Sequence, residues 1–77
     1  MSDLNSAIIQ ALKSAIPACQ TMDIAPETPF DAVAGFDSMS AVSFQVALAG
    51  AIGEKAHAVE PLPGMTVADY ARCLNEV

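Results

Sequence analysis

One serine of the sequence stands where a loop is expected to become a helix. Ser38 follows Gly35 and Asp37 and precedes a segment without charged residues that runs from residue 40 to residue 53. Asp37 is a good helix N-cap, because its carboxylate can accept from free N–H groups of the first turn, and Gly35 permits a close approach of the backbone. Ser38 is then the first helical residue. Its hydroxyl is exposed near the positive end of the helix dipole, where an attached phosphate would be favoured.

Residues 30–39, with the sequence FDAVAGFDSM, resemble the attachment region of acyl carrier proteins. In that family an aromatic residue leads through a loop to Gly-x-Asp-Ser and an apolar residue. The resemblance covers nearly the whole chain, because an amphipathic N-terminal segment and a Thr-Val-x-Asp-Tyr segment at residues 66–70 also match the family. It implies that Ser38 carries a 4′-phosphopantetheine arm taken from coenzyme A. Asp37 would cap the helix that begins at Ser38 and would be the neighbour that enzymes recognise.

The resemblance also implies a function and a set of partners. The arm would hold acyl or related intermediates as thioesters for a fatty-acid, polyketide or specialised biosynthetic pathway, and the cargo stays open among acyl, polyketide and aminoacyl groups. A phosphopantetheinyl transferase, assisted by Mg²⁺, would attach the arm, and synthase or acyltransferase enzymes would use it. The protein itself would not be an enzyme, since the cofactor carries the chemistry. Met39 and Val42 beside the serine are the expected docking contacts.

The segment after Ser38 departs from the fatty-acid members of the family. Many of those place carboxylates along the helix that starts at the serine, whereas this chain has Ser40, Ser43 and the uncharged residues 49–51 there. The departure favours a polyketide-type or other specialised carrier over a housekeeping one. An alternative from another class is a carrier-like protein–protein interaction module that never receives the arm.

Length and charge set independent limits. The 77 residues suffice for one domain, so we expect a single carrier domain over residues 1–77. The formal net charge of −6 makes nucleic acid a poor partner and a basic protein a better one. The sequence shows neither a basic N-terminal region before an apolar run nor a span long enough for a bilayer, which predicts a cytoplasmic protein without a membrane span. We expect a monomer.

Hydrophobic periodicity predicts an all-α fold, a small bundle of three main helices with a short fourth. Apolar residues at helical spacing predict a first helix over residues 3–16, ended by Pro17. Residues 17–37 are expected to form a long loop, pinned to an aliphatic core by Ile24 and Phe30. The second helix should run from residue 38 to about residue 52, where Gly53 ends it. A one-turn helix around residues 56–60 follows, and a capping box at Thr66 opens the last helix.

The second helix is apolar nearly all round, which is typical of a buried central helix. On that interpretation the core would contain Val42, Phe44, Val46, Leu48 and Ile52. The inward residues of the last helix should be Val67, Tyr70, Ala71 and Leu74.

Other reactive residue types give no site. His57, the only histidine, could suggest a hydrolase with Ser38, but the chain lacks a Gly-x-Ser-x-Gly motif and a sheet to support it. A lone histidine defines no metal site either, so we interpret His57 as a solvated loop residue. Cys19 and Cys73 fit no metal-binding spacing. Free thiols are the favoured state of these two cysteines, with a disulfide between them as the alternative.

Overall fold

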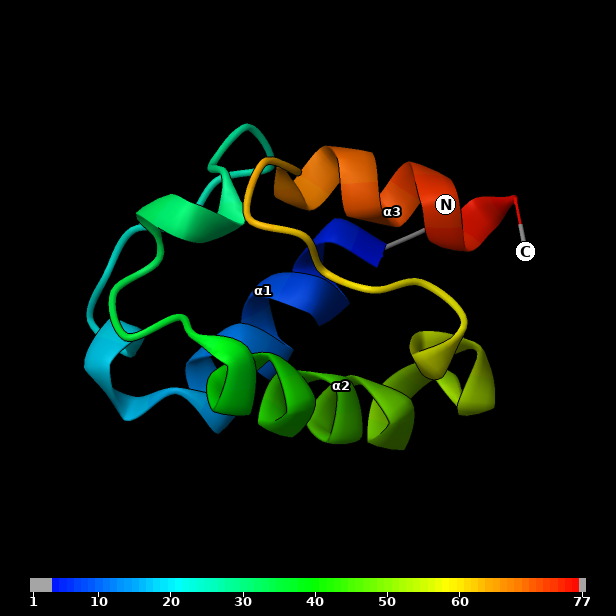
Figure 1. Ribbon diagram of the computed structural model, residues 1–77, viewed down its shortest axis with the longest axis horizontal. Helices are drawn as coiled ribbons and strands as arrows, with labels where there is room; N and C mark the ends of the chain where they lie inside the picture. Colours follow the sequence, from blue (N-terminus) through cyan, green and yellow to red (C-terminus); the bar gives the residue numbers. More distant parts are fainter. Residues whose placement is uncertain (1–3, 77) are drawn as a thin grey trace.

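The computed structural model describes residues 4–76 and forms an all-α bundle (Figure 1). The bundle contains three α-helices and three short 3₁₀ turns, and no strand occurs between residues 4 and 76. Helix α1 crosses behind α2 and α3 and contacts both of them. The bounds, in chain order, are α1 Leu4–Ala15, η1 Pro17–Cys19, η2 Phe30–Ala32, α2 Ser38–Ile52, η3 Glu54–His57 and α3 Val67–Asn75.

Helix α1 packs through the apolar stripe that its sequence predicts. Ile8, Ala11 and Leu12 are buried, and the chain leaves the helix just before Pro17. The predicted helix was one residue longer at its C-terminal end, and its predicted first residue, Asp3, lies outside the described residues.

Helix α2 has the predicted bounds, but it is buried along only one side. Phe44 and Leu48 are fully buried, whereas Val42 and Val46 are 60% and 61% exposed and Ile52 is half-buried. The expectation that α2 is buried nearly all round was therefore wrong for Val42 and Val46. The reason is the size of the bundle, since α1 and η3 pack against α2 along one side and no further layer among residues 4–76 covers the other side.

The long connection between α1 and α2 is more ordered than the sequence suggests. It contains the two turns η1 and η2, and Ile24 and Phe30 are buried as predicted. Its middle part runs alongside residues 63–68, joined to them by an isolated antiparallel bridge between Pro29 and Thr66 and by backbone hydrogen bonds. These bonds run from Phe30 N to Met65 O (2.9 Å), Asp31 N to Pro63 O (3.2 Å), Val67 N to Thr28 O (3.1 Å) and Ala68 N to Pro26 O (2.8 Å).

Most buried core residues are aliphatic, as expected, but the core also contains an aromatic cluster. All four aromatic residues of the chain lie together, and the ring of Phe30 contacts the other three. Its centroid lies 5.3 Å from Phe36 in a stacked arrangement, 5.7 Å from Phe44 and 5.4 Å from Tyr70, which it meets edge-on. Such pairs add stability beyond the area they bury. The loop, α2 and α3 thus share one aromatic cluster.

The last part of the chain follows its sequence signals closely. Thr66 Oγ1 accepts from Asp69 N (3.1 Å), and Asp69 Oδ2 accepts from Thr66 N (3.2 Å), so the predicted capping box is present. The inward residues of α3 are buried as expected. The short helix is displaced from its predicted position at residues 56–60, because Gly53, at φ 89°, ends α2 and lets η3 begin at once with Glu54.

Candidate functional site

The candidate site is the junction between the long loop and α2, where Ser38 is the first residue of the helix and is exposed. Asp37 is the N-cap, and its Oδ1 accepts from Ser40 N at 2.8 Å. This hydrogen bond from the Ser40 backbone lowers the pKa of Asp37, because it favours the ionised carboxylate. The cap fixes the backbone that carries Ser38 and leaves the Ser38 hydroxyl in solvent.

Two further contacts hold the approach to the serine. Ser40 Oγ donates to Gly35 O at 2.8 Å, which ties the first turn of α2 back to the loop. Gly35 has φ 79°, and a Cβ atom placed there would lie 3.0 Å from both Ala18 and Ile16. A larger residue would therefore be strained and would also collide with the segment that follows α1. The sequence indicated a role for Gly35, but it gave no signal for the bond from Ser40.

An apolar groove of about 580 Å³ begins beside Ser38. Its lining residues come from the first half of α2, from the loop before it and from the segment 60–63. The apolar lining residues are Phe36, Ala41, Val42, Pro61, Leu62 and Pro63, and the polar ones are Asp31, Asp37, Ser38, Gln45 and Glu60. The groove joins residues distant in sequence, so the sequence pattern could not predict it.

The wall formed by residues 60–63 is anchored at both ends. Before it, Gln45 Nε2 donates to Ala56 O (3.3 Å) and Val59 O (3.0 Å), and the Tyr70 hydroxyl approaches the same two oxygens at 3.1 and 2.8 Å. At the last residue of this wall, Pro63 O accepts a hydrogen bond from Asp31 N. Burial raises the pKa of Tyr70, opposed by a hydrogen bond with the Gln45 side chain. Side chains of α2 and α3 thus contact the backbone that leads into the groove wall.

The predicted docking residues lie on the outer side of α2 close to the serine. Met39 is 81% exposed and Val42 60% exposed, and Val42 also lines the groove. Val46, one further turn along α2, and Leu62, on the groove wall, are exposed large apolar residues that sequence reasoning did not assign to a surface. These four residues, Met39, Val42, Val46 and Leu62, are here called the apolar ridge.

The other reactive residues do not join this site. His57 is exposed, as expected, and does not line the groove. Cys19 and Cys73 are both free, and burial raises the pKa of the Cys19 thiol. Among residues 4–76 no group of three or more histidine, cysteine or acidic side chains could hold a metal ion. No helix in the same range is long and apolar enough to cross a membrane.

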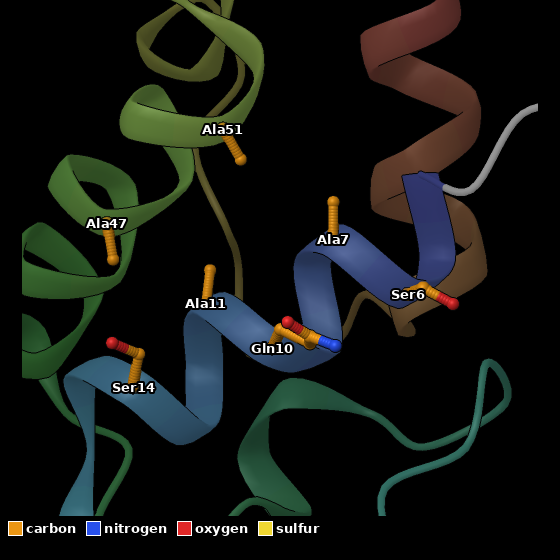
Figure 2. A pocket seen from close by; sticks show the side chains of 7 residues that line it. All are labelled: Ser6, Ala7, Gln10, Ala11, Ser14, Ala47 and Ala51. Atoms are coloured by element: carbon orange, nitrogen blue, oxygen red, sulfur yellow. The ribbon is translucent and has the colours of Figure 1, made fainter.

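A second hollow, of about 420 Å³, lies between α1 and α2 (Figure 2). Alanine side chains from the two helices point into it, with short uncharged polar side chains at its margin. Its lining residues are Ser6, Ala7, Gln10, Ala11, Ser14, Ala47 and Ala51. The lining residues of this hollow are uncharged and offer neither an acid nor a base.

Comparisons with protein-family models, with curated proteins and with solved structures found no match to this chain.

Proposed function

We propose that this protein is a carrier of the acyl-carrier type, which holds acyl or related intermediates as thioesters on a 4′-phosphopantetheine arm attached to Ser38. The observation that carries the proposal is the position of Ser38, an exposed hydroxyl on the first residue of a capped helix at the rim of an apolar groove. A carrier requires an accessible attachment atom on a rigid support, together with a nearby apolar surface that can shelter the attached chain.

The residues around Ser38 fit the arm that the sequence resemblance implies. The phosphate of the arm would lie at the N-terminal end of α2, where the helix dipole favours negative charge. The groove beside the serine offers apolar contacts to the rest of the arm. When bound, the arm supplies the thiol on which the cargo is held as a thioester.

Attachment is a group transfer in which the chain contributes only its hydroxyl. The Ser38 oxygen forms a bond to the phosphorus that bears pantetheine, the phosphoanhydride bond of coenzyme A breaks, and adenosine 3′,5′-bisphosphate leaves with the bridging oxygen. The hydroxyl proton passes to a base of the phosphopantetheinyl transferase. Asp37 keeps the serine in place through its cap, and it is a positioning residue in this step.

Intact-mass measurement after incubation with coenzyme A and a promiscuous phosphopantetheinyl transferase tests the proposal. We expect the wild-type chain to gain one phosphopantetheine and Ser38→Ala to gain none. The fold of the variant should persist, since Asp37 still caps α2 and alanine favours a helix. Ser43→Ala is the matched control, because Ser43 is also exposed on α2 and its loss should leave loading intact. A wild-type chain that stays unmodified, or a loaded Ser38→Ala variant, would contradict the carrier function.

The apolar ridge supports a second candidate, an interaction module that is never modified. Large apolar side chains with most of their area in solvent are typical of a docking surface. On this alternative the ridge binds a partner helix and Ser38 has no covalent role. The mass experiment separates the candidates, because only the carrier gains the arm.

A further inference from the structure

Nearly all polar side chains that line the groove beside Ser38 are hydrogen-bond acceptors. Asp31, Asp37 and Glu60 contribute carboxylates, which at neutral pH accept and do not donate. Neither the two lysines nor the arginine of the chain lines the groove. The Ser38 hydroxyl can donate, but it becomes an ester oxygen once the arm is attached.

Gln45 extends this property to the interior of the groove. It lines the groove and is half-buried, and its Nε2 donates to Ala56 O and Val59 O. These two contacts fix the orientation of the amide, since only the nitrogen can donate to carbonyl oxygens. The amide hydrogens are therefore committed to the protein. The polar atom that Gln45 can offer to a ligand is its carbonyl oxygen.

The remaining lining is apolar, which sets a second requirement on a ligand. Val42 and Leu62 face solvent over more than half of their area, so covering them with an apolar chain is favourable. A carboxylate placed between these side chains and the acidic rim would meet charges of its own sign without a cation to offset them. An ammonium group would meet complementary charge and available acceptors.

The geometry points to a cargo class for this groove, an inference that rests on the proposed carrier function. The groove favours chains that are apolar along their length and end in a hydrogen-bond donor, above all an ammonium group. It disfavours chains that end in a carboxylate. Gln45 and Glu60 are the residues that set this preference.

Matched cargoes test the preference on the full-length protein. A promiscuous phosphopantetheinyl transferase loads Ser38 from coenzyme A thioesters of three eight-carbon chains, which end in a methyl, an ammonium or a carboxylate group. Intact mass verifies each product. ¹H–¹⁵N spectra of each product are then compared with the protein that bears the arm without cargo. We expect the ammonium chain to cause the largest shifts of the backbone amide resonances of Val42 and Leu62 and of the side-chain amide resonance of Gln45. The carboxylate chain should cause the smallest shifts.

Two pairs of variants locate the cause. Glu60→Gln should reduce the difference between the resonance shifts caused by the ammonium chain and those caused by the carboxylate chain. Glu54→Gln makes the same change in net charge outside the groove lining and should not reduce this difference. Gln45→Leu should reduce the shifts caused by the ammonium chain. Tyr70→Phe removes the other donor to the same backbone carbonyls without changing the groove lining, and it should keep the order of the three cargoes.

The outcomes separate the inference from the function beneath it. A chain that gains no arm overturns both. Successful loading with equal shifts for the ammonium and carboxylate chains, or with no shift at Val42 and Leu62, overturns the cargo preference and leaves the carrier function standing. An equal effect of Glu60→Gln and Glu54→Gln would assign the preference to net charge and would also overturn the groove as its source.

Discussion

The surroundings of Asp37 and Tyr70 shift the pKa values of these two side chains, and titration can measure the shifts. Asp37 accepts from the backbone of the helix it caps, while the buried Tyr70 hydroxyl lies against the carbonyl oxygens of Ala56, in η3, and Val59. The first bond favours a charged side chain, and the surroundings of the second favour a neutral one. The two groups therefore respond to pH in opposite directions.

Tyr70 can be observed directly, because it is the only tyrosine and the chain has no tryptophan. Burial raises its pKa, so tyrosinate absorbance should appear in the folded protein at a higher pH than in denaturant, where the midpoint should return to about 10. The folded state holds this proton more tightly than the unfolded state does. Stability should consequently fall as the pH rises above the unfolded value, and Tyr70→Phe should remove that fall. Identical midpoints in the two states would show that the hydroxyl is not buried.

Asp37 gives the opposite dependence in acid. Its pKa is lowered in the folded state, so its contribution is complete above the ordinary aspartate value of about 3.9 and is lost as the pH falls through the folded value. Asparagine can cap the helix without this titration. We expect Asp37→Asn to make unfolding by denaturant less pH-dependent between neutral and acidic pH. Asp69, whose pKa is lowered mainly by the Thr66 backbone N–H, should add to the effect in the double variant Asp37→Asn, Asp69→Asn. An acid dependence as steep as that of the wild type in the double variant would refute this account.

At the scale of the elements, the long loop depends on one side chain. Phe30 is fully buried and contacts the other three aromatic rings, which belong to the loop, α2 and α3. Because the same loop holds Gly35 and Asp37, the position of Ser38 depends on this packing as well as on the helix cap.

Phe30→Ala should therefore be costly. Truncating a fully buried phenylalanine removes about 3–5 kcal/mol, a large share of the 5–15 kcal/mol or so that stabilises a typical domain. Denaturant unfolding measures the loss. Phe36→Ala is the matched control, since Phe36 is only half-buried and touches the same ring, and it should cost less. A loss below about 1 kcal/mol for Phe30→Ala would mean that the ring is not buried.

The elements also show what the sequence could predict. The bounds of α2 and the capping box of α3 follow from local residues, namely Asp37, Gly53 and Thr66, and were predicted. The turns η1 and η2 and the alignment of residues 26–31 with residues 63–68 depend on contacts between distant segments, so periodicity gave no sign of them. The groove was missed for the same reason. Ser38 and the helix cap at Asp37 could be identified because a loop-to-helix junction depends on residues that are adjacent in the sequence.

Over the whole molecule, the charged residues lie outside α2. The formal charge is −6, yet α2 contains no charged residue and carries three of the four exposed residues of the apolar ridge. The burial of Val42 and Val46 was mispredicted because a helix that is apolar all round gives no local sign of the side on which a small bundle leaves it uncovered.

This distribution predicts how a partner binds. Contact through the ridge should dominate, so Met39→Ala should weaken binding of the transferase that would load Ser38 on the proposed function more than Glu54→Gln does. Affinity should change little when ionic strength rises to the physiological range, where the screening length is about 8 Å. Calorimetric titration at several salt concentrations measures both effects. A steep salt dependence together with an unaffected Met39→Ala variant would assign recognition to charges outside α2.

The hydrogen bonds between the long loop and residues 63–68 also bear on where the chain can be divided. A break after the exposed Gly53 would place Ser38 on one peptide and α3 on the other. The four backbone hydrogen bonds, the donors from Gln45 and the aromatic cluster would all cross between the two peptides. The two pieces should therefore reassemble without a covalent link. In such a split protein, Ser38 could receive a group in its native surroundings only after the two peptides have bound each other.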